Sequence, residues 1–338
     1  MKALMIEKPG TALVVERPEP MAGHGEVLVR VARAGLCGTD LGTFLGKNPL
    51  VSYPRVIGHE IAGIVAATAD GVSTVREGTA VAISPYKNCG ACAACQRGRP
   101  NACRNNQTLG VQREGALAEL VAVPADRLYT SESLDVDHLA LVEPFSIGMH
   151  AVRRGRVSGD DSVLVIGCGG VGAGAIAAAA NRGARVLGLD LDDAKLSLAR
   201  AFGAIDACNS ASPSVAQWIA DHTKGEGPDV VIEAVGAAAT YRFALETVAS
   251  CGRVVCVGWV KGDVPLEARH IVAKEMEILG SRNATDEFAD VIALFESRRI
   301  EPLRLVTHRV ALGDAPAMLS EWARQPAAVG KVLVSVSA

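Results

Sequence analysis

The chain has 338 residues, of which 49% are hydrophobic and 21% are charged, and its formal net charge at pH 7 is −3. A chain of this length favours two domains, because a single hydrophobic core stops growing near this size. The nearly balanced charge, without a long basic run, argues against a nucleic-acid-binding surface, and no apolar stretch is long enough to cross a bilayer. Because the N-terminal segment also lacks the features of a secretory signal, we expect a cytoplasmic protein.

Short strand-like segments follow one another through the first part of the chain, separated by Gly, Pro and Asp. They cover residues 26–32, 60–66, 79–83 and 117–123. This rhythm predicts a mostly antiparallel, barrel-like domain over residues 1–150.

A loop inside this domain carries four cysteines in the run CGACAACQRGRPNAC: Cys89, Cys92, Cys95 and Cys103. Glycine and proline residues make the segment a loop with little core into which small apolar side chains could be buried. Four thiolates at this spacing are the ligands of a closed, tetrahedral Zn²⁺ site. Because protein atoms would fill all four positions, this zinc would be structural. The alternative is a chance cluster of small buried residues.

Strand and helix patterns alternate after residue 150. Apolar runs at 162–166, 185–190, 230–234, 253–257 and 276–280 are typical of parallel strands buried on both faces, and 171–182 and 192–202 read as helices. This alternation predicts a doubly wound α/β domain over residues 151–283. The tail from about Asn283 is expected to add one helix and a closing strand at 331–336.

The run VLVIGCGGVG places glycines in G-x-G-x-x-G register between the first of these strands and its helix. We expect the turn to bind a dinucleotide pyrophosphate through Gly167, Gly169, Gly170, Val171 and Gly172. Asp190 ends the next strand, where a carboxylate can accept hydrogen bonds from ribose hydroxyls and would repel a 2′-phosphate. NAD is therefore favoured over NADP. The alternative role of Asp190 is that of a helix cap.

Three further segments carry side chains that could ligate a metal. GLCGTD supplies Cys37, Thr39 and Asp40, GHEIAG supplies His59 and Glu60, and LVEPFSIGMHA supplies Glu143 and His150. A lone Cys or His is most often structural. Taken with the cysteine loop and the glycine motif, in this order and over essentially the whole chain, they resemble the zinc-dependent medium-chain dehydrogenase/reductase family.

The resemblance implies a GroES-like β-barrel catalytic domain formed by residues 1–150 and 284–338, a Rossmann NAD-binding domain over 151–283, and two zinc ions per chain. Cys37 and His59 match ligands of the catalytic zinc. Glu60 and Glu143 match acidic positions that ligate the metal or hold its water, and which of the two binds directly stays open.

The resemblance also assigns supporting roles. Thr39 matches the hydroxyl that begins a proton relay, although it could instead serve a turn, and Asp40 would orient His59 through its other ring nitrogen. Where Glu143 stands, alcohol dehydrogenases of the family carry a cysteine. The chain therefore looks like the sorbitol, L-threonine and sugar-acid dehydrogenases, which oxidise a secondary hydroxyl to a ketone by hydride transfer to NAD.

The substrate is less well specified. The segment between the metal motifs offers Lys47, Asn48, Ser52 and Tyr53 for hydroxyls or a carboxylate, although solvated loop residues are the simpler interpretation. The sequence segments GKNP and YPRVIGHE are similar to those of L-galactonate and L-gulonate 5-dehydrogenases. This similarity predicts a polyol or hexonate substrate. Sorbitol, butanediol, L-threonine and simple secondary alcohols are the alternatives.

The sequence disfavours two other functional classes, and the resemblance suggests an oligomeric state. A zinc-free quinone reductase is disfavoured by the four cysteines, and a non-enzymatic relic by the intact set Cys37, His59 and Glu143. Relatives of this type suggest a homodimer or homotetramer, with residues 253–260 and 268–281 as contact surfaces, because an exposed strand edge needs covering.

Overall fold

The computed structural model describes residues 1–337 and separates into two compact units. The first unit contains residues 1–143 and 288–296 and the chain from 302 onward, and the second contains 144–287 and 297–301. The boundary predicted after residue 150 falls inside helix α4 (Val142–Arg154), and the boundary predicted after residue 283 lies just before helix α10 (Glu287–Glu296).

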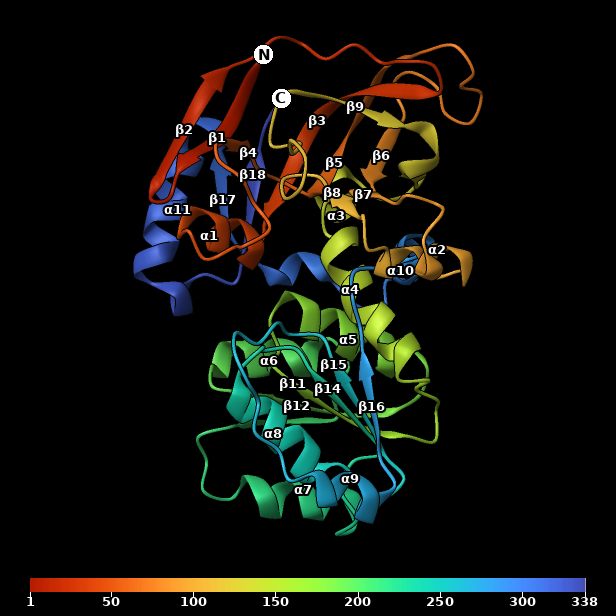
Figure 1. Cartoon of the computed structure of the whole chain (residues 1–338), viewed down its shortest axis with the longest axis vertical. Coiled ribbons are helices and arrows are strands. Elements are labelled where there is room, and N and C mark those ends of the chain that lie inside the picture. Colours follow the sequence, from red (N-terminus) through yellow and green to blue (C-terminus); the bar gives the residue numbers. More distant parts are fainter. Residues whose placement is uncertain (338) are drawn as a thin grey trace. The chain divides into compact units, whose positions relative to one another are not determined.

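The first unit is built mostly from antiparallel strands, as predicted (Figure 1). Its central strand β3 (Glu26–Leu36) pairs with β5 (Glu60–Thr68) on one side. On the other side it pairs with β9 (Leu120–Pro124) through its first half and with β18 (Lys331–Ser335) through its last residues. Side chains alternate along the first half of β3, so that Val27, Val29 and Val31 are fully buried in the core while Arg30 between them is exposed.

The remaining elements of this unit complete three sheets and several short helices. The strands are β1 (Lys2–Lys8), β2 (Thr11–Glu16), β4 (Arg55–Val56), β6 (Ala80–Ile83), β7 (Tyr86–Lys87), β8 (Gln107–Thr108), β10 (Leu128–Thr130) and β17 (Val306–Ala311). The helices are α1 (Gly38–Phe44), α2 (Ala93–Gln96), α3 (Val136–Leu139) and α11 (Ala315–Arg324).

The prediction for the tail was wrong in its element count. Two helices, α10 and α11, occur there instead of one, and the additional strand β17 pairs in parallel with β18. α11 begins with Pro316 in its first turn, which suits a helix start but reads as a loop signal in the sequence. Alternate residues of β17 are exposed, so the strand lacks the continuous apolar run that identifies a buried strand.

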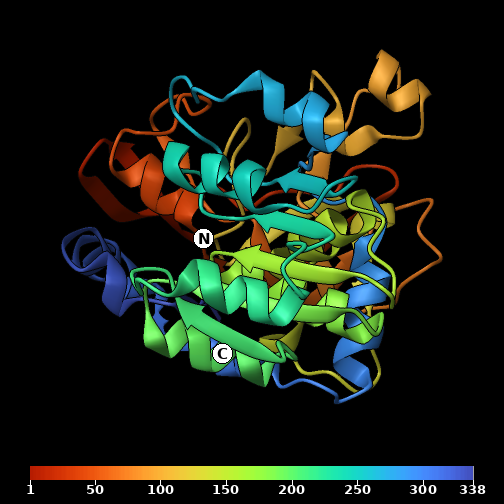
Figure 2. The same cartoon turned by 90° about the horizontal axis from the view of Figure 1, so that it is seen from below.

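The second unit contains one parallel sheet of six strands in the order β13-β12-β11-β14-β15-β16, and helices pack along it (Figure 2). This is the doubly wound order 3-2-1-4-5-6, with the switch point between β11 and β14. The strands are β11 (Ser162–Ile166), β12 (Arg185–Asp190), β13 (Asp206–Asn209), β14 (Val230–Glu233), β15 (Arg253–Cys256) and β16 (Glu277–Gly280). The helices between them are α5 (Gly170–Asn181), α6 (Asp193–Ala201), α7 (Val215–Thr223), α8 (Ala238–Thr247) and α9 (Ala268–Lys274).

The predicted strands β11 and β12 have the expected ends, whereas β13 was missed. All five residues of β11 are buried, because a central parallel strand is covered on both faces. β13 has only four residues, with the sequence DACN, and is half-exposed at the sheet edge, so it carries no apolar run. Among residues 1–337, no helix is both long and apolar enough to span a membrane.

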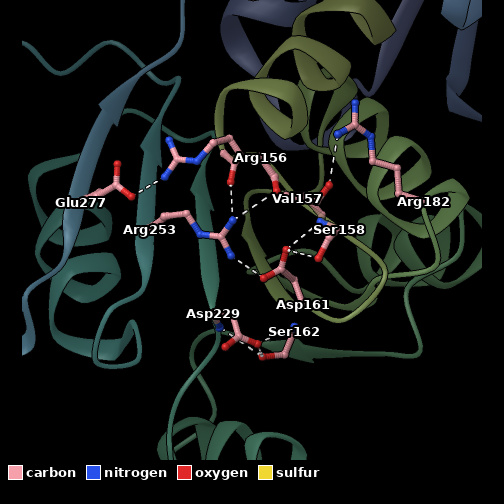
Figure 3. A network of polar contacts seen from close by, with 10 residues as sticks. Arg156, Val157, Ser158, Asp161, Ser162, Arg182, Asp229, Arg253 and Glu277 are labelled. Carbon is pink, nitrogen blue, oxygen red and sulfur yellow. Dashed lines mark hydrogen bonds and ion pairs between the residues drawn. The ribbon is translucent and has the colours of Figure 1, made fainter.

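Polar contacts fasten the amino ends of the parallel strands (Figure 3). Arg253, at the start of β15, pairs with Asp161 and donates to the carbonyl oxygens of Gly155 and Arg156 at 2.8 and 3.2 Å. Asp229 accepts hydrogen bonds from the backbone N–H and the hydroxyl of Ser162 at 2.8 and 2.6 Å. These contacts fix the ends of the strands opposite to the ends that carry the glycine motif.

Replacing Arg253 with methionine should lower the free energy of unfolding of the protein by about 2–4 kcal/mol, because a mostly buried carboxylate would lose its cationic partner. Urea denaturation followed by intrinsic tryptophan fluorescence measures this loss. The matched control is Arg269→Met, since the Arg269 side chain is 79% exposed beside Glu267 and should contribute less than about 0.5 kcal/mol. Equal losses in the two variants would contradict the assigned role.

Candidate active site

The glycine motif forms the turn between β11 and α5 at the switch point of the parallel sheet. Gly167 has a φ of 90°, in the left-handed region that favours glycine. A Cβ on Gly172 would lie 1.7 Å from the carbonyl oxygen of Gly167, so only glycine lets the helix approach the turn this closely. A Cβ on Gly169 would meet no atom within 4 Å, so this side of the turn is open. The space beside Gly169 and the first turn of α5 suits a pyrophosphate.

Asp190 ends β12 beside this turn and holds it. Its Oδ2 accepts a hydrogen bond from the N–H of Cys168 at 2.8 Å, and its Oδ1 accepts from the N–H of Asp192 at 3.1 Å. The cap of α6 is a different residue, because Asp192 accepts from the N–H of Ala194 at 2.8 Å. Asp190 is therefore a half-buried carboxylate that is hydrogen-bonded to the glycine turn, and Asp192, not Asp190, caps the helix.

The four cysteines of the loop come together around one point. Their sulfur atoms all lie within 4.8 Å of one another. Sulfur–sulfur distances are 3.6 Å for Cys92–Cys95, 3.8 Å for Cys92–Cys103 and 3.5 Å for Cys89–Cys103. Four sulfurs at about 2.3 Å from a tetrahedral zinc would be about 3.8 Å apart, so the loop already has the dimensions of such a site.

Backbone N–H groups prepare one of these sulfurs for a metal. Hydrogen bonds from the backbone of Cys95 and Arg104 lower the pKa of Cys92 to about 6. Burial, with the neighbouring sulfurs, raises the pKa of Cys95 to about 12. Cysteine binds zinc as the thiolate, so metal binding at this loop would release the protons that its thiols carry.

The second group of candidate ligands forms where β3 ends and β5 begins. Cys37 follows β3 directly and precedes α1, and His59 and Glu60 lie at the start of β5. The antiparallel register places Gly35 opposite Glu60, which brings these segments together although they are far apart in the sequence. The ligating atoms of Cys37, His59 and Glu60 all lie within 4.8 Å of one another, and sulfur, imidazole and carboxylate together fit Zn²⁺.

Asp40 supports His59 from the first turn of α1. Asp40 Oδ1 lies 3.7 Å from His59 Nδ1, which is too far for a hydrogen bond, and neither of these buried atoms has a hydrogen-bond partner within residues 1–337. The second oxygen of Asp40 accepts from the N–H of Cys37 at 2.9 Å. Burial opposes a charge on His59, but Asp40 and the other surrounding anions outweigh it and raise the pKa of His59 well above its usual value. The ring is thus held with Nδ1 toward Asp40, which leaves Nε2 for a metal.

Glu143, in the first turn of α4, is held by a tyrosine. Its Oε1 accepts a hydrogen bond from the Tyr86 hydroxyl at 2.5 Å. Glu143 does not belong to the group formed by Cys37, His59 and Glu60, whose ligand atoms lie within 4.8 Å of one another. Burial, together with repulsion from Glu60, raises the pKa of Glu143 to about 7, although His59 opposes the shift. The structure therefore unites three of the four expected ligands and holds the fourth through Tyr86.

Lys331 is a site residue that the sequence did not reveal. It opens β18, and its Nζ lies 2.6 and 2.7 Å from the two carboxylate oxygens of Glu60. Burial opposes its charge, but Glu60 outweighs this and raises the pKa of Lys331. The only signal in the sequence was a lysine at the head of an apolar strand, and Tyr86 had no signal beyond its place before the cysteine loop.

The other expected residues have the following positions. Thr39 is half-buried in the first turn of α1, and its carbonyl oxygen accepts from the Thr43 hydroxyl at 2.9 Å. In the expected substrate segment, Tyr53 donates to the Thr43 carbonyl at 2.6 Å, and Asn48 donates to the Thr43 hydroxyl at 3.2 Å. Ser52 accepts from Arg55 at 2.9 Å. These polar groups are bonded to residues of the adjoining elements α1 and β4, which supports the simpler interpretation for them.

Comparison with known proteins identifies the family of the chain. Residues 23–133 match the model of the alcohol dehydrogenase GroES-like domain, and residues 170–297 match that of the zinc-binding dehydrogenases. L-galactonate-5-dehydrogenase of Escherichia coli K12 is 32% identical over 310 residues, which cover 91% of each chain. Sorbitol dehydrogenase of Bacillus subtilis 168 is 31% identical over 319 residues, covering 92% of this chain and 90% of its own.

A solved structure extends the match to the whole fold. The crystal structure of an alcohol dehydrogenase (rspB) from Escherichia coli CFT073 with the cofactor NADH has a TM-score of 0.92 and 31% identity, and covers 99% of both chains. The chain belongs to the zinc-type medium-chain alcohol/polyol dehydrogenases. The predicted combination of a GroES-like domain with a Rossmann domain is confirmed, and the protein is a zinc- and NAD(H)-dependent dehydrogenase.

Two glycine variants separate packing from cofactor contact at the turn. Gly172→Ala should lower the melting temperature and weaken NADH binding by about tenfold or more, because its Cβ would collide with backbone at Gly167. Gly169→Ala should leave the melting temperature unchanged but still weaken NADH binding, since its Cβ would occupy the open side of the turn. Thermal melts and NADH fluorescence titrations measure both. Wild-type NADH affinity in Gly169→Ala would remove this site from consideration.

Proposed function

We propose that the protein oxidises a secondary hydroxyl of a polyol or sugar acid with NAD, using a catalytic zinc bound by Cys37, His59 and Glu60, with Glu143 as an exchangeable fourth ligand. The observation that carries this proposal is the convergence of the first three side chains within 4.8 Å. When bound, the metal would supply Lewis acidity that lowers the pKa of a hydroxyl group, and NAD would accept the hydride.

The side chains around this group have complementary tasks. Asp40 fixes the tautomer of His59, so that the same ring nitrogen always faces the metal position. The Thr39 hydroxyl, in the turn that follows Cys37, would accept the proton of the substrate hydroxyl while passing its own proton on, as the first member of a relay that ends in solvent. Glu143, whose Oε1 accepts a hydrogen bond from Tyr86 at 2.5 Å, would exchange with a water at the metal position.

The cysteine loop has a structural task in this proposal. Cys89, Cys92, Cys95 and Cys103 would bind a second zinc with no open position, and the loop contains only short elements such as α2 and β8. Since such a loop has little core of its own, the metal would supply much of its stability.

Asp190 supports NAD over NADP at the other site. Its carboxylate lies at the end of β12 beside the glycine turn, where it would accept hydrogen bonds from ribose hydroxyls and repel a 2′-phosphate. Gly167, Gly170, Val171 and Gly172 would complete the binding site for the pyrophosphate.

Hexonates such as L-galactonate or L-gulonate are the substrates that we favour. The relatives that carry names of substrates include L-galactonate and sorbitol enzymes, which act on polyhydroxylated molecules. Two carboxylates and a lysine around the metal position also make a polar surrounding. A plain aliphatic alcohol would gain little from such groups.

A homodimer or homotetramer is proposed from the edge of the parallel sheet. β16 is the last strand of that sheet, and Ile278 within it is 43% exposed. Trp259 and Val272 nearby in the sequence are 68% and 82% exposed, which is unusual for large apolar side chains. A second copy would cover this edge. A monomer in size-exclusion chromatography with light scattering would refute this assembly.

Metal analysis tests the zinc assignment. The purified protein should contain two zinc ions per chain, and Cys37→Ser should contain one, because the cysteine loop is unaffected. Cys92→Ser is the matched change at the loop and should lower the thermal stability more strongly than Cys37→Ser does. A wild-type chain with one zinc would indicate a binding relic, and a chain with none would indicate a zinc-free reductase.

A substrate panel tests the chemistry. With NAD, kcat/KM for L-galactonate or L-gulonate should exceed kcat/KM for isopropanol and 2,3-butanediol by about tenfold or more, since a site that hydrogen-bonds hydroxyls rejects molecules that lack them. NADH formation at 340 nm is the measurement. If the simple alcohols react faster, the hexonate proposal fails while the dehydrogenase class stands.

A further inference from the structure

Glu60 has a second partner besides the candidate metal position. The ion pair between Glu60 and Lys331 is almost completely shielded from water, with side-chain exposures of 1% and 7%. Lys331 Nζ contacts both carboxylate oxygens at 2.6 and 2.7 Å and lies 3.4 Å from the carbonyl oxygen of Leu36. A buried cation therefore engages both of the oxygens that a metal would use.

Gly35 provides the space for this arrangement. It stands opposite Glu60 in the pairing of β3 with β5. A Cβ on Gly35 would lie 1.9 Å from Glu60 Oε2 and 3.0 Å from its Cδ. Its backbone is not in the left-handed region, so what the position requires is room for the carboxylate. Because Gly35 has no side chain, there is room for the Glu60 carboxylate beside Lys331. We call this space, which Gly35 and Lys331 border, the seat of the carboxylate.

The seat and the metal position compete for one side chain. The acidic groups that interact with Lys331 are those of Cys37, Asp40, Glu60 and Glu143. A zinc ion held by Cys37, His59 and Glu60 would share the Glu60 carboxylate with the ammonium group. Two cations bound to the same carboxylate repel each other, and the repulsion is strong where water is excluded. Each cation therefore weakens the hold of the other.

We propose that Lys331 is a positioning residue that weakens the bond between Glu60 and the catalytic zinc by holding the carboxylate in the seat formed with Gly35. This inference rests on the zinc site of the proposed function. Tyr86 holds Glu143 in a comparable way, so that neither glutamate is committed to the metal. A coordination position then stays available for the oxygen of a substrate.

The test is the rate at which the full-length protein gives up zinc to a chromogenic chelator. In Lys331→Met the competing cation is lost, so Glu60 binds the metal fully, and one of the two zinc ions should leave about tenfold or more slowly than in the wild type. The zinc at the four cysteines should leave at an unchanged rate and serves as an internal reference. Lys331→Arg keeps the charge and should stay close to the wild type.

Gly35→Ala provides a second route to the same effect if Lys331→Met folds poorly. Its methyl group would fill the seat while Lys331 is retained, so it too should slow the release of the catalytic zinc. Gly313→Ala is the matched control, because a Cβ at Gly313 would meet no atom within 4 Å. Gly313 also belongs to none of the motifs that supply the candidate ligands. Glu60→Gln combined with Lys331→Met should remove the effect of the lysine substitution.

The outcomes separate the possible failures. Unchanged or faster zinc release in both Lys331→Met and Gly35→Ala would overturn the inference, because a residue that merely stabilises the site would loosen the metal when removed. Slower release that persists in the Glu60→Gln background would also overturn it, since the effect would not pass through Glu60. A wild-type protein that binds only the zinc of the cysteine loop would instead overturn the proposed function.

Discussion

The register between β3 and β5 is the constraint on which the candidate active site depends. It places Gly35 opposite Glu60 and so brings Cys37, just beyond the end of β3, next to His59. A shift of one residue would turn Glu60 to the other face of the sheet. β18 pairs with the same end of β3 and sets Lys331 beside this group. Three strands from distant parts of the chain thus converge where the chemistry is proposed.

The meeting of these three strands concentrates acidic side chains in a region that is shielded from solvent. Asp40, Glu60 and Glu143 are all buried, and the thiol of Cys37 adds a fourth acidic group. Unpaired buried carboxylates are costly, so each has a compensating neighbour: His59 for Asp40, Lys331 for Glu60 and Tyr86 for Glu143. A divalent metal would relieve the remaining imbalance. Metal binding and the stability of the first unit are therefore expected to be linked.

The sequence predicted the parts of the fold that short-range patterns determine. β11 and β12 were predicted to the residue, because parallel strands buried on both faces leave continuous apolar runs bounded by Gly and Asp. The glycine turn was predicted for a similar reason, since its requirement for close approach is local. β13, β17 and α11 were missed because the short edge strand, the half-exposed strand and the helix that starts at proline carry weaker signals.

In the candidate site, too, the residues that lie in short motifs could be predicted from the sequence, whereas their partners from distant segments could not. Cys37, His59 and Glu60 lie in short motifs at chain turns, so their residue types could be recognised in the sequence. Which glutamate binds the metal could not, because the answer depends on partners that no motif announces. Lys331 lies 271 residues from Glu60, and Tyr86 lies 57 residues from Glu143. The packing of segments that are distant in the sequence, and not the motif itself, decides which partner draws each carboxylate away from the metal position. The strength of that interaction determines how readily a substrate oxygen can take the place of the carboxylate.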